Sequence, residues 1–335
     1  MFGRPARPGI RWGNELIDLR AFDPSIARTL NELFARDRQA ALTIRVRVQE
    51  ALAANRSLPS VPVATQALHL PFTIPNFVDF YSSREHATNV GRLFRDPTNP
   101  LPENWLYLPA GYNGRASNVM PTGTPIHRPR GQHKDAAGEL VFAPTAQLDF
   151  ELELGAFLCP GAPDSLAGFV LLNDWSARDI QRWEYTPLGP FLSKAFATTV
   201  SPYLVLPEAL AAYRCDGPPQ DPSPFPYLHV PEPRAWNIHL EAERIPGGIL
   251  AHSNYRDMYW SLGQQLAHLL SAGVRFQTGD LIGSGTISGP TSQGSLIERG
   301  GPFLNDGDTV ILRGYAGETV GFGELINTIH ASTSL

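Results

Sequence analysis

The sequence predicts a mostly β protein with few helices, arranged as a small N-terminal region followed by one large domain. Strand-like runs recur from about residue 76 onward, whereas only one long helical segment is evident in that stretch. The 30 glycines and 31 prolines follow no period, which indicates many turns and ordered loops. With 335 residues, the chain is long enough to bury a large core.

The N-terminal region is expected to be mainly helical between residues 14 and about 55. A first segment opens at Pro24 and Ser25, and its apolar residues have helical spacing, namely Ile26, Leu30, Leu33 and Phe34. A second helical segment covers residues 40–54. Residues 57–76 are interrupted by prolines, which predicts a linker or an extended wrap.

The larger region is predicted to consist mainly of strands. The β-branched or alternating runs bounded by turn residues are 168–172, 203–206, 236–243, 280–283 and 309–313. One helix is expected over residues 255–271. Ser253 and Asn254 are its candidate caps, and Gly273 is its expected stop.

Residues 148–154 alternate between acidic and apolar side chains. A strand has a two-residue period, so Asp149, Glu151 and Glu153 are expected on one face. Burial of stacked carboxylates is costly unless a cation lies against them, and hard ions such as Mg²⁺ and Ca²⁺ take oxygen ligands. The alternative is an antiparallel strand with one solvated face.

Two further segments concentrate residues suited to catalysis. Residues 79–91 contain Asp79, Tyr81 and His86 within eight positions, although an isolated histidine is more often structural. Asp174 follows an apolar run and is expected at the mouth of a buried strand, where a carboxylate is typical of a functional site. The alternative for Asp174 is a helix N-cap before Trp175.

Composition excludes several functional classes. The net charge of −5 and the pI of about 6.0 leave no basic field for nucleic acid or anionic lipid. No apolar stretch is long enough to span a bilayer, and residues 1–13 lack the apolar core of a signal peptide. Cys159 and Cys215 form neither a disulfide framework nor a metal-binding spacing, so a cytoplasmic protein with reduced thiols is expected.

These segments resemble the fumarylacetoacetate hydrolase family over about residues 75–323. The blocks that carry the resemblance are 81–91, 111–117, 173–202 and 284–290, in the family's order. The resemblance implies a β-roll or barrel catalytic domain over residues 71–335. It also implies that residues 1–70 form a reduced N-terminal region in place of the SH3-like barrel of mammalian members.

The resemblance implies a role for each matching residue. The metal positions, for Mg²⁺ or Ca²⁺, are Asp79, Glu151, Glu153, Asp174, Thr198 and Lys194, the last through its backbone carbonyl. The general base is His86 and the acid that orients it is Glu298, after a loop one residue shorter than in the mammalian pattern. The oxyanion donors are Arg178, Gln181 and Lys194. The substrate contacts are Tyr81, Arg95, Tyr112, Gln181, Tyr185 and Thr286. Asp149 has no matching role.

The implied reaction is hydrolysis of a carbon–carbon bond in fumarylacetoacetate, a diketo dicarboxylic acid. Its products are fumarate and acetoacetate, in the last step of tyrosine and phenylalanine catabolism. A cation chelating two substrate oxygens would fix the substrate's orientation, and His86 would deprotonate the attacking water. The oxyanion donors would stabilise the resulting alkoxide, while Glu298 would hold the useful imidazole tautomer.

Alternatives remain at this point. One is an acylpyruvate hydrolase, decarboxylase or isomerase of the same superfamily. Another is a non-catalytic, metal-stabilised β protein. Arg178 in isolation would be explained equally well by a surface ion pair with Asp179 or Glu184. The expected partners are a small-molecule substrate and a second copy in a homodimer, with no nucleic acid and no membrane.

Overall fold

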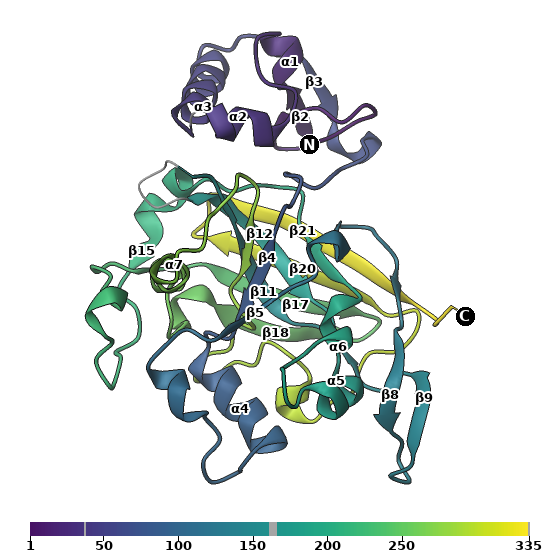
Figure 1. The fold of residues 1–335 in the computed structure, drawn as a ribbon. Helices are drawn as coiled ribbons and strands as arrows, with labels where there is room; N and C mark the ends of the chain where they lie inside the picture. Colours follow the sequence, from purple (N-terminus) through teal and green to yellow (C-terminus); the bar gives the residue numbers. More distant parts are fainter. Residues whose placement is uncertain (37, 161–165, 334–335) are drawn as a thin grey trace.

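Two β-sheets form the body of the molecule, and a small N-terminal module lies above them (Figure 1). The structure, a computed structural model, describes residues 1–36, 38–160 and 166–333. Most strand pairs are antiparallel, and the predicted mostly β class is confirmed. In the described residues no helix is both long and apolar enough to cross a membrane.

The larger sheet has seven strands in the order β5-β4-β19-β11-β12-β14-β6. Their bounds are β4 Phe77–Phe80, β5 Gly111–Asn113, β6 Val119–Pro121, β11 Leu152–Leu158, β12 Leu166–Asp174, β14 Thr198–Val200 and β19 Leu281–Gly283. The second sheet has five strands in the order β18-β17-β20-β21-β7. Their bounds are β7 Ile126–His127, β17 His239–Ile245, β18 Gly248–Asn254, β20 Thr309–Ala316 and β21 Val320–His330.

Smaller pairs and helices complete the large region. The two-stranded pairs are β8 Arg130–Lys134 with β9 Leu140–Pro144, β10 Leu148–Asp149 with β13 Ser176–Ala177, and β15 Arg214–Cys215 with β16 Ala235–Trp236. The α-helices are α4 Arg84–Phe94, α5 Arg178–Glu184, α6 Leu192–Ala195 and α7 Leu262–Ser271. Helices α4, α5 and α6 lie at the end of the body away from the N-terminal module (Figure 1).

The strand β11 is buried on both faces, which explains the uncharged run after the acidic residues. On one face, Leu152 and Leu154 share a core with Leu312 of the second sheet. On the other face, Phe157 belongs to a core that includes Phe34 of the N-terminal module. A strand covered on both sides needs apolar residues at successive positions.

The N-terminal module combines a three-stranded sheet with three helices. Its elements are β1 Gly9–Trp12, β2 Glu15–Asp18, β3 Ser60–Pro62, α1 Leu19–Phe22, α2 Leu30–Arg36 and α3 Arg38–Ala53. The predicted second helix is confirmed as α3, whereas the first, α2, begins at Leu30 and not at Pro24 or Ser25. The helical prediction was wrong for residues 15–18, because β2 pairs with both β1 and β3. Part of the expected 57–76 linker is therefore the strand β3.

Two other predictions were wrong in detail. Residues 203–206 form no strand and make only an isolated bridge, between Val205 and Phe169. The expected 255–271 helix is a 3₁₀ turn, Tyr255–Asp257, followed by α7. Ser261 caps α7 through a capping box with Gln264, whereas the Asn254 side chain caps only the 3₁₀ turn. Gly273 follows the helix end with φ of +76°, as a C-terminal glycine should.

Candidate active site

Four buried carboxylates from neighbouring strands meet at one place on the seven-stranded sheet. They belong to Asp79, Glu151, Glu153 and Asp174, and one oxygen from each lies within 4.8 Å of the others. Asp79 is on β4, Glu153 on β11 and Asp174 at the end of β12, while Glu151 directly precedes β11. This four-carboxylate cage rules out the solvated-face alternative for residues 148–154. It also rules out the N-cap alternative for Asp174.

A glycine makes the cage possible. Strand β19 lies between β4 and β11, and Gly283 is opposite Asp79 in its register. A Cβ atom at Gly283 would lie 2.2 Å from Oδ1 of Asp79 and 3.2 Å from Oε2 of Glu153. The absent side chain therefore lets the two carboxylates approach each other across the intervening strand.

Two buried cations neutralise part of the cage. Nζ of Lys194 lies 2.5 Å from Oε2 of Glu151 and 2.9 Å from Oδ2 of Asp174. Nη1 of Arg178 lies 2.9 Å from Oε1 of Glu151. Burial opposes ionisation of Glu151, but Lys194 and Arg178 outweigh it and lower its pKa. Glu151 and Asp174 therefore have cation partners, whereas Asp79 and Glu153 have none among the described residues.

Asp79 and Glu153 are the two cage acids without a cation partner among the described residues. Burial, followed by repulsion from the other carboxylates, raises the pKa of both well above the usual range. Oδ1 of Asp79 and Oε1 of Glu153 are buried and have no hydrogen-bond partner among the described residues. An oxygen-only donor set with unpaired oxygens and two acids that lack a cation partner fits a hard divalent cation.

The other two predicted metal positions also lie at the cage. The Thr198 hydroxyl donates to Oδ1 of Asp174 at 2.8 Å. Lys194 reaches the cage through its ammonium group, and a ligand role for its backbone carbonyl stays a prediction.

His86 lies between the cage and a second buried acid. It sits in the first turn of α4, where Ser83 caps the helix by accepting from the His86 amide. Its Nε2 atom is 3.9 Å from Oε1 of Glu151, and its Nδ1 atom is 2.9 Å from Oε1 of Glu298. The structure thus brings together the predicted base and its predicted acid, which are far apart in the sequence.

Glu298 lies on the 3₁₀ turn Ile297–Arg299, and three side chains donate hydrogen bonds to its carboxylate. Ser288 and Ser295 donate to its Oε1 at 2.8 and 3.0 Å, and Asn89 donates to its Oε2 at 3.0 Å. Burial opposes ionisation, but His86 and these hydrogen bonds lower the pKa of Glu298 to about 2. The acid is therefore an anion at neutral pH.

The predicted oxyanion donors adjoin the same cage. Arg178 is 1% exposed, and its Nη1 also donates to Oε1 of Gln181 at 3.1 Å, so the surface-pair alternative was wrong. Its Nε donates to Oδ2 of Asp149 at 2.9 Å. Its Nη2 is buried and has no partner among the described residues. This nitrogen therefore remains free for a substrate oxygen.

The predicted substrate contacts are distributed over several elements. The Tyr112 hydroxyl donates to Asp174 at 2.6 Å, and Oγ1 of Thr286 is buried without a partner among the described residues. The Tyr81 ring packs edge-on to His86 at 5.4 Å, and burial raises its pKa to about 12. Exposed Arg95 donates to backbone carbonyls, including that of Ala87 at 3.2 Å.

Tyr185 is half-buried and packs beside the end of α4. Its ring stacks on Phe94, and its hydroxyl donates to the Phe94 carbonyl at 3.1 Å. The structure therefore places it against the end of α4 and does not bring it to the cage.

Sequence reasoning missed the residues that support the His86–Glu298 pair. Asn89 carried a usable signal, because it follows His86 by three residues and so shares a helix face. Ser83, Ser288 and Ser295 carried none, since serines of this kind are common in loops. Asp149 was noticed in the acidic row, but it was given no role.

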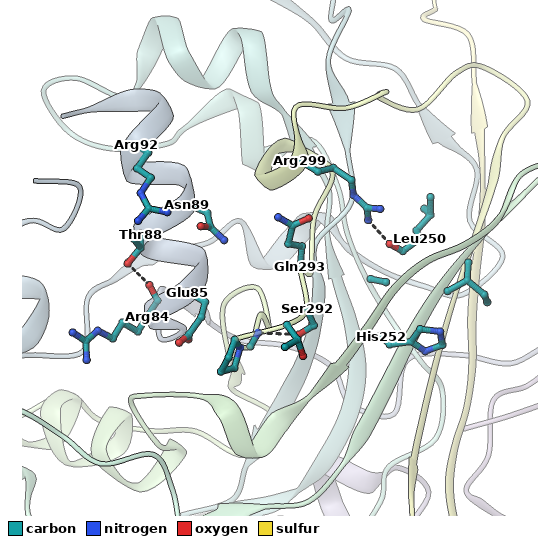
Figure 2. Close-up of a pocket in the computed structure, with 15 residues that line it drawn as sticks. Arg84, Glu85, Thr88, Asn89, Arg92, Leu250, His252, Ser292, Gln293 and Arg299 are labelled. Atoms are coloured by element: carbon teal, nitrogen blue, oxygen red, sulfur yellow. Dashed lines mark hydrogen bonds between the residues drawn. The ribbon is translucent and has the colours of Figure 1, made fainter. Parts of the chain in front are cut away.

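A cavity of about 690 Å³ lies between α4, β18 and the segment 289–293 (Figure 2). Figure 2 shows Asn89 and Gln293 facing it from opposite sides. Gln293 donates to the backbone carbonyl of Glu298 at 3.3 Å. None of the four cage acids lines this cavity, so we separate it from the site of the chemistry.

The chain is similar to a known family and to known proteins. The model of the fumarylacetoacetate (FAA) hydrolase C-terminal family matches residues 76–330. Human fumarylacetoacetase is 45% identical over 305 residues, which cover 80% of this chain and 73% of the human protein. The fumarylacetoacetase of Arabidopsis thaliana is 38% identical over 376 residues, covering 95% and 89%.

Solved structures show the same fold at low identity. A maleylpyruvate hydrolase from Sphingobium, in complex with manganese(II) and pyruvate, has a TM-score of 0.59 at 17% identity, covering 98% of this chain and 97% of that one. A fumarylacetoacetate hydrolase from Exiguobacterium antarcticum also has a TM-score of 0.59 at 17% identity, with coverage of 97% and 95%.

Proposed function

The chain belongs to the fumarylacetoacetate hydrolase family, and from this premise we propose how it hydrolyses fumarylacetoacetate to fumarate and acetoacetate. This reaction is the last step of tyrosine and phenylalanine catabolism. The observation that carries the proposal is the His86–Glu298 pair set against a buried four-carboxylate cage, in a chain 37–45% identical to fumarylacetoacetases.

The proposed cofactor is a divalent cation, Mg²⁺ or Ca²⁺, held by Asp79, Glu151, Glu153 and Asp174. When bound, it would chelate two oxygens of the diketone and polarise a carbonyl group. Elemental analysis of the purified protein, followed by reconstitution with each ion, tests this assignment. A protein that keeps full activity after exhaustive chelation would contradict it.

His86 is the proposed general base. Nδ1 lies 2.9 Å from the Glu298 carboxylate, so we assign the ring proton to Nδ1, which leaves the lone pair of Nε2 for the reaction. Nε2 then takes a proton from the water that attacks the ketone carbon. The carbon–carbon bond breaks when the alkoxide collapses, and the acetoacetate carbon takes a proton in turn.

The oxyanion donors are supplied by atoms that the protein leaves unused. Arg178 offers Nη2. The side-chain carbonyl of Gln181 accepts from Arg178, so the amide N–H groups of Gln181 are available to donate to a substrate oxygen. Lys194 has three N–H bonds and uses two of them, on Glu151 and Asp174. We assign these donors to the alkoxide.

The substrate carboxylates are assigned to Arg95, Tyr81, Tyr185 and Thr286, with Tyr112 and Gln181 nearer to the diketone. Nε and Nη2 of Arg95 each donate to a backbone carbonyl, so its Nη1 end is the part open to a substrate carboxylate. A rate comparison between fumarylacetoacetate and a panel of acylpyruvates tests substrate choice. Fast turnover of an acylpyruvate, with no hydrolysis of fumarylacetoacetate, would overturn it.

We also propose a cytoplasmic homodimer in which residues 71–335 form the catalytic domain and residues 1–70 a small N-terminal domain. The β8–β9 hairpin projects beside α5 (Figure 1), and large apolar side chains are exposed there. They are Leu140, Phe142, Trp183, Leu188 and Phe191. Sedimentation of the Phe142→Ser variant tests this face. A dimer of unchanged affinity would exclude it.

A further inference from the structure

Asp149 is a buried acid that the proposed mechanism does not use. It belongs to the same acidic row as Glu151 and Glu153, yet it is not part of the cage. Its exposure is 0%, so it does not face solvent, and its carboxylate is outside the group of oxygens that meet in the cage. An ionised carboxylate in such a place needs a full set of partners.

Those partners come from two separate parts of the active site. Oδ1 accepts from the Leu296 amide at 2.8 Å and from the adjacent Phe150 amide at 2.8 Å. Oδ2 accepts from the Ile297 amide at 3.0 Å and from Nε of Arg178 at 2.9 Å. One carboxylate therefore connects the guanidinium of Arg178 with the start of the turn that carries Glu298.

The contact with Arg178 decides which nitrogen is left for substrate. A guanidinium is planar and rigid, so fixing two of its nitrogens fixes the third. Asp149 holds Nε, while Glu151 and Gln181 hold Nη1. Nη2 is left over, and the loss of the Asp149 contact would free the group to rotate about its remaining bonds.

The contact of Asp149 with residues 296–297 fixes the position of Glu298. The first amides of a helical turn lack intrahelical acceptors, and here a side chain from β10 accepts from two of them. Glu298 follows directly and lies against His86. Asp149 thus sets the position of the Glu298 turn relative to Arg178.

We propose that Asp149 is a positioning residue that fixes the oxyanion donor Arg178 and the Glu298 turn relative to each other. This inference rests on the proposed function of the two groups. It accounts for the third acid of the alternating row, because Asp149 on β10 and Glu151 just before β11 contact the same guanidinium group.

The test is Asp149→Asn, with Asp179→Asn as the matched control. Asparagine can keep one acceptor, but its amide nitrogen would face the N–H groups of Ile297 and Arg178, or of Leu296. Asp179 is also a buried acid, which accepts from the Ala146 amide at 2.7 Å and from the Ile180 amide at 2.9 Å. No contact of its carboxylate reaches Arg178 or Glu298 in the described structure.

The expected result for Asp149→Asn is a kcat lowered roughly 10- to 100-fold, with KM within about twofold. In the Asp179→Asn control, Tm falls while kcat is retained. The effect of Asp149→Asn should also be non-additive with Arg178→Gln, because the two residues act through one contact. Equal kcat losses in both Asp variants, or strict additivity with Arg178→Gln, would overturn the proposal.

Hydrogen exchange at the Leu296 and Ile297 amides separates this inference from the proposed reaction, because it needs no substrate. Exchange should become faster at these amides in Asp149→Asn and stay unchanged in Asp179→Asn. The double variant Asp149→Asn/Arg178→Gln removes both members of the Asp149–Arg178 ion pair, so it provides a folded sample if the single variant is unstable. Unchanged protection at both amides would overturn the positioning role even in an enzyme with the expected activity.

Discussion

The imidazole of His86 lies 2.9 Å from a carboxylate oxygen of Glu298 on one side and 3.9 Å from a cage oxygen of Glu151 on the other. The ring is therefore fixed between an anion that orients it and the place where a chelated substrate would lie. This arrangement makes the role of each ring nitrogen testable.

Replacement of His86 by alanine should remove turnover and leave the fold and metal binding in place. A general base contributes about 10²- to 10⁴-fold to a rate, so kcat should fall within that range. Kinetics, circular dichroism and metal content on the same sample check this expectation. The control is His229→Ala, an exposed histidine hydrogen-bonded to the Pro224 carbonyl. A kcat close to the wild-type value in His86→Ala would exclude the base role.

The acidic row shows how far sequence reasoning reaches. Alternation over residues 148–154 separated the acids from the apolar residues, which share one core, but the segment is two strands, β10 and β11, and not the single strand predicted. It could not show that the acids are buried, because burial depends on strands and helices distant in the sequence, including the N-terminal module. The same limit explains Asp149, whose partners Leu296 and Ile297 are contributed by a turn near the other end of the chain.

Residues in loops were the least predictable. Ser288 and Ser295 hold Glu298 through tertiary contacts that leave no periodic trace. The missed strand at residues 15–18 has a similar origin, since β2 exists through pairing with β1 and β3 and not through local propensity.

Glu298→Gln should lower kcat roughly 10- to 100-fold, since a neutral amide no longer fixes the imidazole tautomer. The same variant should also show that ionised Glu298 contributes to the free energy of unfolding in a way that depends on pH. The pKa of Glu298 is lowered from 4.5 to about 2, so its contribution is fully present above pH 4.5 and is lost as the pH falls through 2. Denaturant unfolding at several pH values should show the wild-type advantage shrinking across that window. An advantage that does not vary with pH would contradict the lowered pKa of Glu298.

Metal affinity should rise with pH. The raised pKa values of Asp79 and Glu153 mean that protons compete with the cation for their oxygens. Raising the pH removes those protons, so binding tightens. Titration calorimetry with Mg²⁺ and Ca²⁺, in buffers of different ionisation enthalpy, would measure both the affinity and the protons released. Binding without proton release would mean that the two acids are already ionised.

Gly283→Ala should weaken metal binding although it replaces none of the proposed metal ligands. Its new Cβ would lie 2.2 Å from Oδ1 of Asp79, a distance that no real Cβ contact tolerates, so the carboxylate must move. Gly283 is paired on both sides, with Asp79 on β4 and Gly155 on β11, so the backbone has little freedom to retreat. We therefore expect the strain to appear as a displaced Asp79, with metal affinity and kcat falling together.

The matched control is Gly321→Ala, because Gly321 also lies in a paired strand and a Cβ there would meet no atom within 4 Å. Isothermal titration with Mg²⁺ and steady-state kinetics on both variants compare the two sites. Gly321→Ala should bind the ion as the wild type does. If Gly283→Ala also keeps wild-type affinity and rate, the approach of Asp79 to Glu153 across β19 is not what builds the cation site, and the cage must be held by Glu151 and Asp174 alone.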